Sequence, residues 1–182
     1  MIKIRKGTFE TNSSSTHSIA ISKNKVEIPV GLCIHFNIGE YGWEKGKYNF
    51  ADYMYTSLLC NNDAEGFQKL KSILDKWGIR YKFQSPKWSY CGEYERNRYL
   101  DNGYIYYSYE TYDIMREILD DEDLLARALF GDSAVYTGND NSSETDSMCY
   151  CSDEYIWDYR DDKEIKNPNH DSEHYDYFFK GN

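Results

Sequence analysis

The stretch DAEGFQKLKSILDKWGIRYKF (residues 63–83) changes its apolar period once. Up to residue 77 the apolar side chains recur every three or four residues, which predicts one face of a helix. These side chains are Phe67, Leu70, Ile73, Leu74 and Trp77. Asp63 is suited to cap this helix and Gly78 to end it, and the alternation of IRYKF (79–83) then predicts a strand. A helix stopped by glycine and followed at once by a strand indicates a compact α-to-β connection.

Two further helical patterns flank this unit. Asn49 precedes a helix expected over residues 49–60, with Phe50, Tyr53, Met54, Ser57 and Leu58 on its apolar side. The longest pattern covers residues 108–130, and the acidic run DDED (120–123) is expected to break it into two helices before Gly131 ends it. Its apolar positions are Ile114, Ile118, Leu119, Leu125 and Leu129.

Strand patterns alternate with these helices in no fixed order. Strands are expected at residues 2–9, 18–22, 31–39, 104–109 and 134–137, the fourth of them after an Asn102-Gly103 turn. Because no steady βαβ alternation is present, we predict an α+β fold with a mixed, mainly antiparallel sheet and two to four helices. Residues 1–131 would form its core, and residues 132–182 an acidic, tyrosine-rich C-terminal part of the same domain.

Charge is concentrated at the C-terminal end. Residues 132–182 hold 13 acidic and 4 basic residues, a formal charge of −9, whereas the rest of the chain carries −1. Such a region repels nucleic acid and attracts basic partners. Basic residues near the start of the chain are dispersed, so at most a weak nucleic-acid contact is expected. A tyrosine-rich surface is compatible with a homodimer.

Five cysteines at irregular spacing, with no signal-peptide pattern before them, indicate free thiols in a cytoplasm. No apolar run approaches the length of a membrane span. We therefore expect a cytoplasmic protein that contacts no membrane, and nothing in the sequence calls for a cofactor.

The loop FETNSSSTHS (9–18) is the first candidate site. Ser14 or Ser15 could be a nucleophile with His17 as its base, and Glu10 and Asp140 could orient or complete the site. However, triads are usually assembled from distant segments, and no G-x-S-x-G elbow is present. Ser, Thr and Asn side chains also bond to nearby backbone, so we favour a rigid structural or binding loop, which could also hold a phosphate.

Metal binding is a weaker hypothesis. His170 and His174 are four residues apart, the spacing that places two ligands on one helix face. Cys149 and Cys151 form a C-x-C pair, which is not the usual spacing of a structural zinc site. A solvated acidic tail is the simpler interpretation, and no metal is expected.

The acidic C-terminal region is the third candidate. Its carboxylates alternate with aromatic residues, and such a row could imitate nucleic-acid phosphates and occupy a groove lined with Arg and Lys. The expected partner-binding residues are Asp153, Glu154, Tyr155, Trp157, Asp158, Asp161 and Asp162. The alternative is an ordinary charged, solvated face.

Three stretches, FETNSSSTHSI, FNIGEYGW and TGNDN, resemble in this order a family of small proteins carried by bacteriophages and mobile elements. The three stretches together hold 24 of the 182 residues. It implies an anti-CRISPR role, in which the protein binds a type II RNA-guided DNA nuclease with its guide RNA in the bacterial host cell. It implies no catalytic residues.

Two hypotheses follow. The first is a non-enzymatic inhibitor that blocks DNA binding or cleavage through an acidic surface. The second is a small hydrolase or group transferase that uses the loop with Ser14 and His17.

Overall fold

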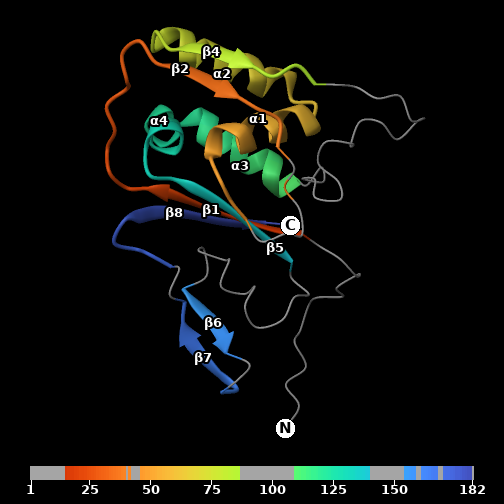
Figure 1. The fold of residues 1–182 in the computed structure, drawn as a ribbon, viewed down its shortest axis with the longest axis vertical. Helices are drawn as coiled ribbons and strands as arrows, with labels where there is room; N and C mark the ends of the chain where they lie inside the picture. The colour runs from red at the N-terminus through yellow and green to blue at the C-terminus, as the bar shows by residue number, and fades with distance from the viewer. Residues whose placement is uncertain are drawn as a thin grey trace, which may run out of the picture.

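We describe the fold from a computed structural model of residues 1–182. The described residues are 15–39, 41, 46–86, 109–139, 154–158, 161–167 and 170–181. They form four helices and a four-stranded antiparallel sheet, which confirms the α+β class (Figure 1). The strands expected at residues 2–9 and 104–108 lie outside the described residues.

The main sheet has the strand order β3-β5-β1-β8. Its strands are β3 (Gly46–Tyr48), β5 (Ala134–Asn139), β1 (Ser15–Ser22) and β8 (Tyr175–Gly181). β1 is central and pairs antiparallel with β5 on one side and with β8 on the other. The helices lie together on one side of this sheet (Figure 1). They are α1 (Phe50–Cys60), α2 (Ala64–Lys76), α3 (Tyr109–Asp120) and α4 (Glu122–Phe130).

The predicted helix-to-strand unit at residues 63–83 is confirmed. The Asp63 carboxylate accepts a hydrogen bond of 2.9 Å from the Gly66 amide, so Asp63 caps α2. Gly78 takes a φ of +69°, and the Ile79 amide then bonds back to the Leu74 carbonyl at 2.9 Å. This closure at the helix end directs the chain straight into β4 (Arg80–Phe83).

β4 runs parallel to β2 (Cys33–Phe36) in a separate two-stranded sheet, so the described strands are mixed in direction and mainly antiparallel, as expected. The reason for the parallel direction is topological. β3, α1 and α2 lie between these two strands in the chain, and a long crossover containing helices brings the second strand back in the same direction.

The expected break in the longest helical pattern occurs at Asp121. This residue is extended, and its side chain accepts hydrogen bonds of 3.0 Å from the amides of Asp123 and Leu124. It therefore caps α4 immediately after α3 ends.

The core lies between the main sheet and the helices. Apolar residues from α1, α2, α3, α4 and the sheet are buried in one cluster. Most of the positions predicted for the apolar helix faces belong to it, including Phe50, Tyr53, Met54, Leu70, Ile118 and Leu125. Ile114 and Leu129 are only half-buried at its edge.

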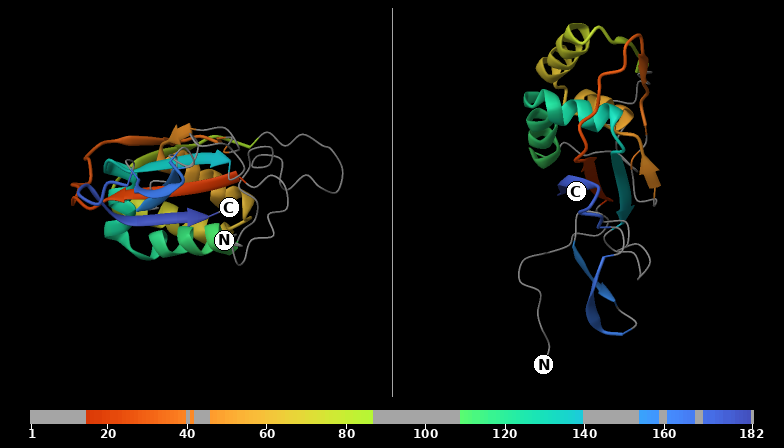
Figure 2. Two further views of the ribbon diagram at one scale, coloured as in Figure 1. Left: turned by 90° about the horizontal axis from the view of Figure 1, so that it is seen from below. Right: turned by 90° about the vertical axis from the view of Figure 1, so that its left-hand side faces the viewer.

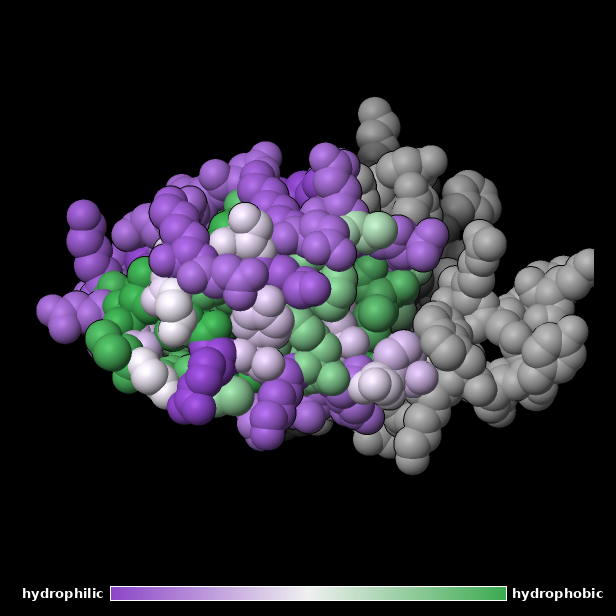
Figure 3. All heavy atoms as spheres, turned by 90° about the horizontal axis from the view of Figure 1, so that it is seen from above, coloured by the Kyte–Doolittle hydropathy of each residue, from purple (hydrophilic) through white to green (hydrophobic). Residues whose placement is uncertain are grey.

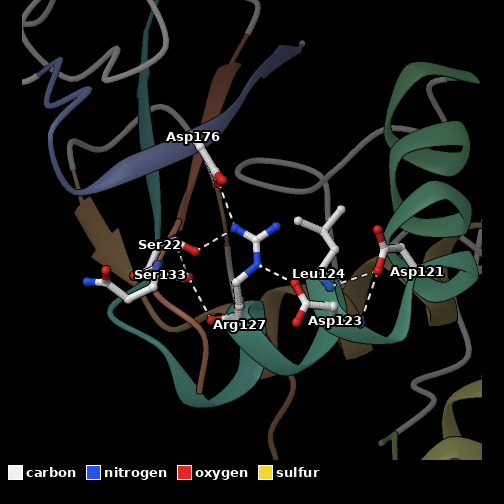
Figure 4. Close-up of polar contacts among 8 residues, drawn as sticks. Ser22, Asp121, Asp123, Leu124, Arg127, Ser133 and Asp176 are labelled. Carbon is white, nitrogen blue, oxygen red and sulfur yellow. Dashed lines mark hydrogen bonds and ion pairs between the residues drawn. The ribbon is translucent and has the colours of Figure 1, made fainter. Parts of the chain in front are cut away.

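The C-terminal region contains three strands whose periodicity is too weak to predict. β8 joins the main sheet, and the Arg127 side chain links α4 to it (Figure 4). The Arg127 guanidinium donates to the Ser22 carbonyl at 2.8 Å and to the Asp176 carboxylate at 2.6 Å, and it also contacts Asp123 at 3.1 Å. Since Ser22 ends β1 and Asp176 lies in β8, one side chain joins three elements.

β6 (Tyr155–Asp158) and β7 (Lys163–Lys166) form a separate antiparallel hairpin. It lies at the opposite end of the long axis from α2, β2 and β4 (Figure 1). The right-hand view in Figure 2 shows the same separation between the hairpin and that end. Within the described part of the chain, no helix is long and apolar enough to cross a membrane.

Candidate functional site

His17, the proposed base of the FETNSSSTHS loop, lies inside the core. It is 2% exposed, and its Nδ1 is 3.0 Å from the phenol oxygen of Tyr53 on α1. The ring meets the Tyr53 ring edge-on, with 5.6 Å between centroids. Its other nitrogen, Nε2, is buried and has no hydrogen-bond partner among the described residues.

Three tyrosines continue this cluster. The Tyr53 ring lies 5.1 Å from that of Tyr41, and the Tyr41 ring lies 4.9 Å from that of Tyr48 in β3. His17 also pairs with Thr137 in the β1–β5 ladder. His17, Tyr41 and Thr137, which belong to the stretches FETNSSSTHSI, FNIGEYGW and TGNDN, thus meet at one end of the main sheet.

Burial controls the protonation of this cluster. Loss of hydration lowers the pKa of His17 to about 4 and raises the pKa values of Tyr53 and Tyr41 well above the usual range. At neutral pH the imidazole and both phenols are therefore uncharged. The arrangement suits a packed hydrogen-bonded pair better than a general base, which must reach substrate and is oriented by a third group.

The other members of the proposed catalytic set, Glu10, Ser14 and Asp140, lie outside the described residues. Their neighbours Ser15 and Asn139 are paired in the β1–β5 ladder. The contact of His17 with Tyr53 could not be read from the sequence, where Tyr53 is one apolar position of a helix.

The β6–β7 hairpin carries most of the expected partner-binding residues. Glu154, Asp161 and Asp162 are exposed, Tyr155 is 54% exposed and Asp158 is half-buried. Asp162 lies in the turn with a φ of +49°. Together with Asp161, it gives the turn two adjacent, exposed carboxylates. Asp153 lies outside the described residues, and only the backbone of Trp157 is described.

The pairing in this hairpin divides the acidic row. Tyr155 and Asp158 are three positions apart in β6, so their side chains leave on opposite faces. Asp158 pairs with Lys163, and the Lys163 ammonium is also 2.6 Å from the Asp161 carboxylate. Residues 154–167 contain five acidic and three basic residues, so their formal charge is −2. The exposed carboxylates of this segment are those of Glu154, Asp161, Asp162 and Glu164.

His170 and His174 do not share a helix face. Residues 172–174 form a turn that leads into β8. His174 Nδ1 is 2.6 Å from the Asp171 carboxylate, whereas the His170 ring stacks on Phe178 with 4.3 Å between centroids. Among the described residues, no three His, Cys, Asp or Glu side chains are grouped as metal ligands. Cys149 and Cys151 lie outside them.

Comparison with known proteins finds no matching family model, curated protein or solved structure.

Proposed function

We propose that this protein is a non-enzymatic, anti-CRISPR inhibitor that binds a type II RNA-guided DNA nuclease and blocks its use of DNA. The contact surface is the β6–β7 hairpin. The nuclease holds nucleic acid in positively charged channels and recognises the adjacent DNA motif with arginine side chains. A protruding acidic turn with a neighbouring tyrosine is complementary to such a surface.

One observation carries this proposal: the hairpin presents Asp161, Asp162, Glu164 and the half-exposed Tyr155 at one end of the molecule. Carboxylates form strong charge-assisted hydrogen bonds with arginine, and tyrosine is enriched at protein interfaces. The alternative, a hydrolase or group transferase that uses Ser14 and His17, is disfavoured because His17 is buried and neutral.

A titration tests the proposal. The full chain is added to a guide-loaded type II nuclease, and DNA cleavage is measured against the molar ratio. We expect inhibition to saturate near one inhibitor per nuclease and to weaken with salt, because opposite charges attract less as ionic strength rises. Inhibition at a small fraction of that ratio would indicate turnover and overturn the proposal, as would full cleavage at large excess.

Matched variants locate the surface. The double substitution Asp161→Lys and Glu164→Lys is expected to weaken inhibition at least about tenfold, because like charges then face the partner. The double substitution Glu27→Lys and Glu173→Lys makes the same charge change at two exposed acidic positions outside the hairpin and should leave inhibition unchanged. Equal effects of the two changes would show that total charge matters and the hairpin does not.

A further inference from the structure

Among the described residues, the two-stranded β2–β4 sheet is covered on its inner side only. There the Phe36 and Phe83 rings stack with 4.8 Å between centroids, and Phe83 also packs against Phe67 of α2 and Tyr55 of α1. Parallel strands are normally covered on both faces, and two strands alone make a marginally stable sheet. The described residues provide no third strand and no cover for the outer side.

The outer side of this sheet is basic. Cys33 pairs with Arg80 and His35 pairs with Lys82, so these four side chains share the face opposite the aromatic cluster. His35, Arg80 and Lys82 are exposed. We call these three residues the basic face. The basic face is thus positively charged in a chain whose formal net charge is −10.

An apolar loop borders the basic face. Val30 is fully exposed and Leu32 is 39% exposed. Arg80 holds this loop in place, because its guanidinium donates to the Gly31 carbonyl at 3.0 Å and its amide to the Leu32 carbonyl at 3.1 Å. At this end of the molecule, hydrophobic side chains reach the surface between hydrophilic ones (Figure 3). Exposed apolar residues rimmed by charge are typical of a protein-interaction surface.

The β6–β7 hairpin has complementary properties. It too is a two-stranded sheet, with no third strand among the described residues. Asp161 and Asp162 in its turn carry negative charge, opposite in sign to the basic face. The large apolar side chains exposed in the described part are Val30 and Leu32 at one end and Tyr155 on the hairpin. The two sheets lie at opposite ends of the long axis (Figure 1).

From this complementarity we infer that the β2–β4 sheet of one copy of this chain binds the β6–β7 hairpin of a second copy. The hairpin turn and Glu164 meet the basic face, Tyr155 packs beside Val30 and Leu32, and strand edges add backbone hydrogen bonds. Because two different surfaces meet, the contact is head-to-tail and builds rings or open chains. The inference does not depend on the proposed function, although the contact covers the same hairpin.

Sedimentation velocity and light scattering of the purified full chain test the contact. We expect species larger than the 21.5 kDa monomer as concentration rises. Raising the ionic strength from about 0.1 M to about 1 M shortens the Debye length from about 10 Å to about 3 Å and should weaken the association. A monomer at every concentration and salt level would overturn the inference.

Two single charge reversals address the two surfaces separately. Lys82→Glu changes the basic face and keeps the bond from Arg80 to Gly31, and Glu164→Lys changes the hairpin. Each variant alone should associate at least about tenfold more weakly, because like charges then meet. Mixed, the two variants should associate with each other again, since one retains a native hairpin and the other a native basic face.

Controls carry the same charge changes elsewhere. Lys25→Glu and Glu173→Lys lie at exposed positions away from β2, β4 and the hairpin strands, and they should associate as the unmodified chain does. Circular dichroism and thermal melting confirm that each variant is folded. The inference fails if Lys82→Glu associates normally, if the control reversals weaken association equally, or if the mixed variants remain monomeric.

Discussion

The imidazole Nδ1 of His17 and the phenol oxygen of Tyr53 lie 3.0 Å apart inside the core, joining β1 to α1. This contact makes His17 part of the folded core, and it links the protonation of one residue to the stability of the whole fold. The first two predictions follow from it.

Acid should destabilise the protein through His17. Its pKa is about 4 in the fold against about 6.5 when unfolded, so between these values the unfolded chain binds more protons. The stability that this residue contributes is complete above the unfolded pKa and is lost as pH falls toward 4. Between pH 7 and pH 5 the loss should be about 2 kcal/mol.

Urea unfolding of the unmodified chain and of His17→Gln at both pH values measures this term. Glutamine does not titrate, so its stability should fall by about 2 kcal/mol less over the same range. Other titratable groups change the stability of both proteins equally, so they cancel when the two stability changes are subtracted. Parallel pH profiles would show that His17 is not buried and neutral in the fold.

Removing the Tyr53 hydroxyl should also be costly. Tyr53→Phe leaves Nδ1 of His17 without its partner, beside an Nε2 that has none among the described residues, and should cost about 1–3 kcal/mol in urea unfolding. Tyr55→Phe is the matched control. The Tyr55 hydroxyl donates to the carbonyl of exposed Gln84 at 2.8 Å, where water can replace it, so a smaller loss is expected. Equal losses would contradict the assigned burial of the His17 bond.

Asp63 connects α2 to α3 as well as capping α2. Its side chain is 3% exposed and forms a bidentate pair with Arg116, in which Nε lies 2.6 Å from Oδ2. Arg116→Gln should cost about 2–4 kcal/mol in urea unfolding, because it leaves a buried carboxylate without its cation. The control Lys69→Gln removes the exposed pair with Asp120 and should cost less than about 1 kcal/mol. A similar small cost for both would show that water reaches Asp63.

Arg127 should determine how firmly β8 is held. Lysine cannot reproduce the fork that reaches Ser22, Asp123 and Asp176 together, so Arg127→Lys should loosen the C-terminal strand. Hydrogen exchange of the β8 amides should accelerate by about tenfold, the effect of losing about 1.4 kcal/mol locally, while α1 amides keep their protection. Lys163→Gln, which breaks an exposed pair in the hairpin, should leave both rates unchanged. Uniform acceleration would indicate global destabilisation.

Short sequence patterns predicted where the helices begin and end, but they did not predict which strands pair with each other. The caps at Asn49, Asp63 and Asp121 and the stop at Gly78 act within a few residues, so the sequence contains their whole cause. The parallel β2–β4 pair joins segments more than forty residues apart, and no local pattern sets its direction. β8 was missed because it is stabilised by pairing with β1 and by Arg127, which the sequence places far away.

The candidate sites show the same limit. The His17 loop was favoured as structural from its hydroxyl-rich composition, but the buried partner Tyr53 lies 36 positions away. The acidic row at residues 153–162 reads as continuous in sequence, whereas strand pairing brings Lys163 opposite Asp158 and places neighbouring side chains on opposite faces. Charge in a hairpin is therefore set by the register, which the sequence did not specify.

Substitution of Gly78 tests the helix-to-strand connection at residues 63–83. Its φ is +69°, and an added Cβ would meet nothing within 4 Å, so any cost of substitution comes from backbone conformation. Gly78→Ala should lower the free energy of unfolding by about 1 kcal/mol. Gly78→Asn should cost less, because asparagine tolerates this conformation. Gly31 has a φ of +76° and equally open space, so Gly31→Ala should cost a similar amount in the same urea titration. A neutral Gly78→Ala would show that α2 can end in another conformation and still deliver β4 to its place beside β2.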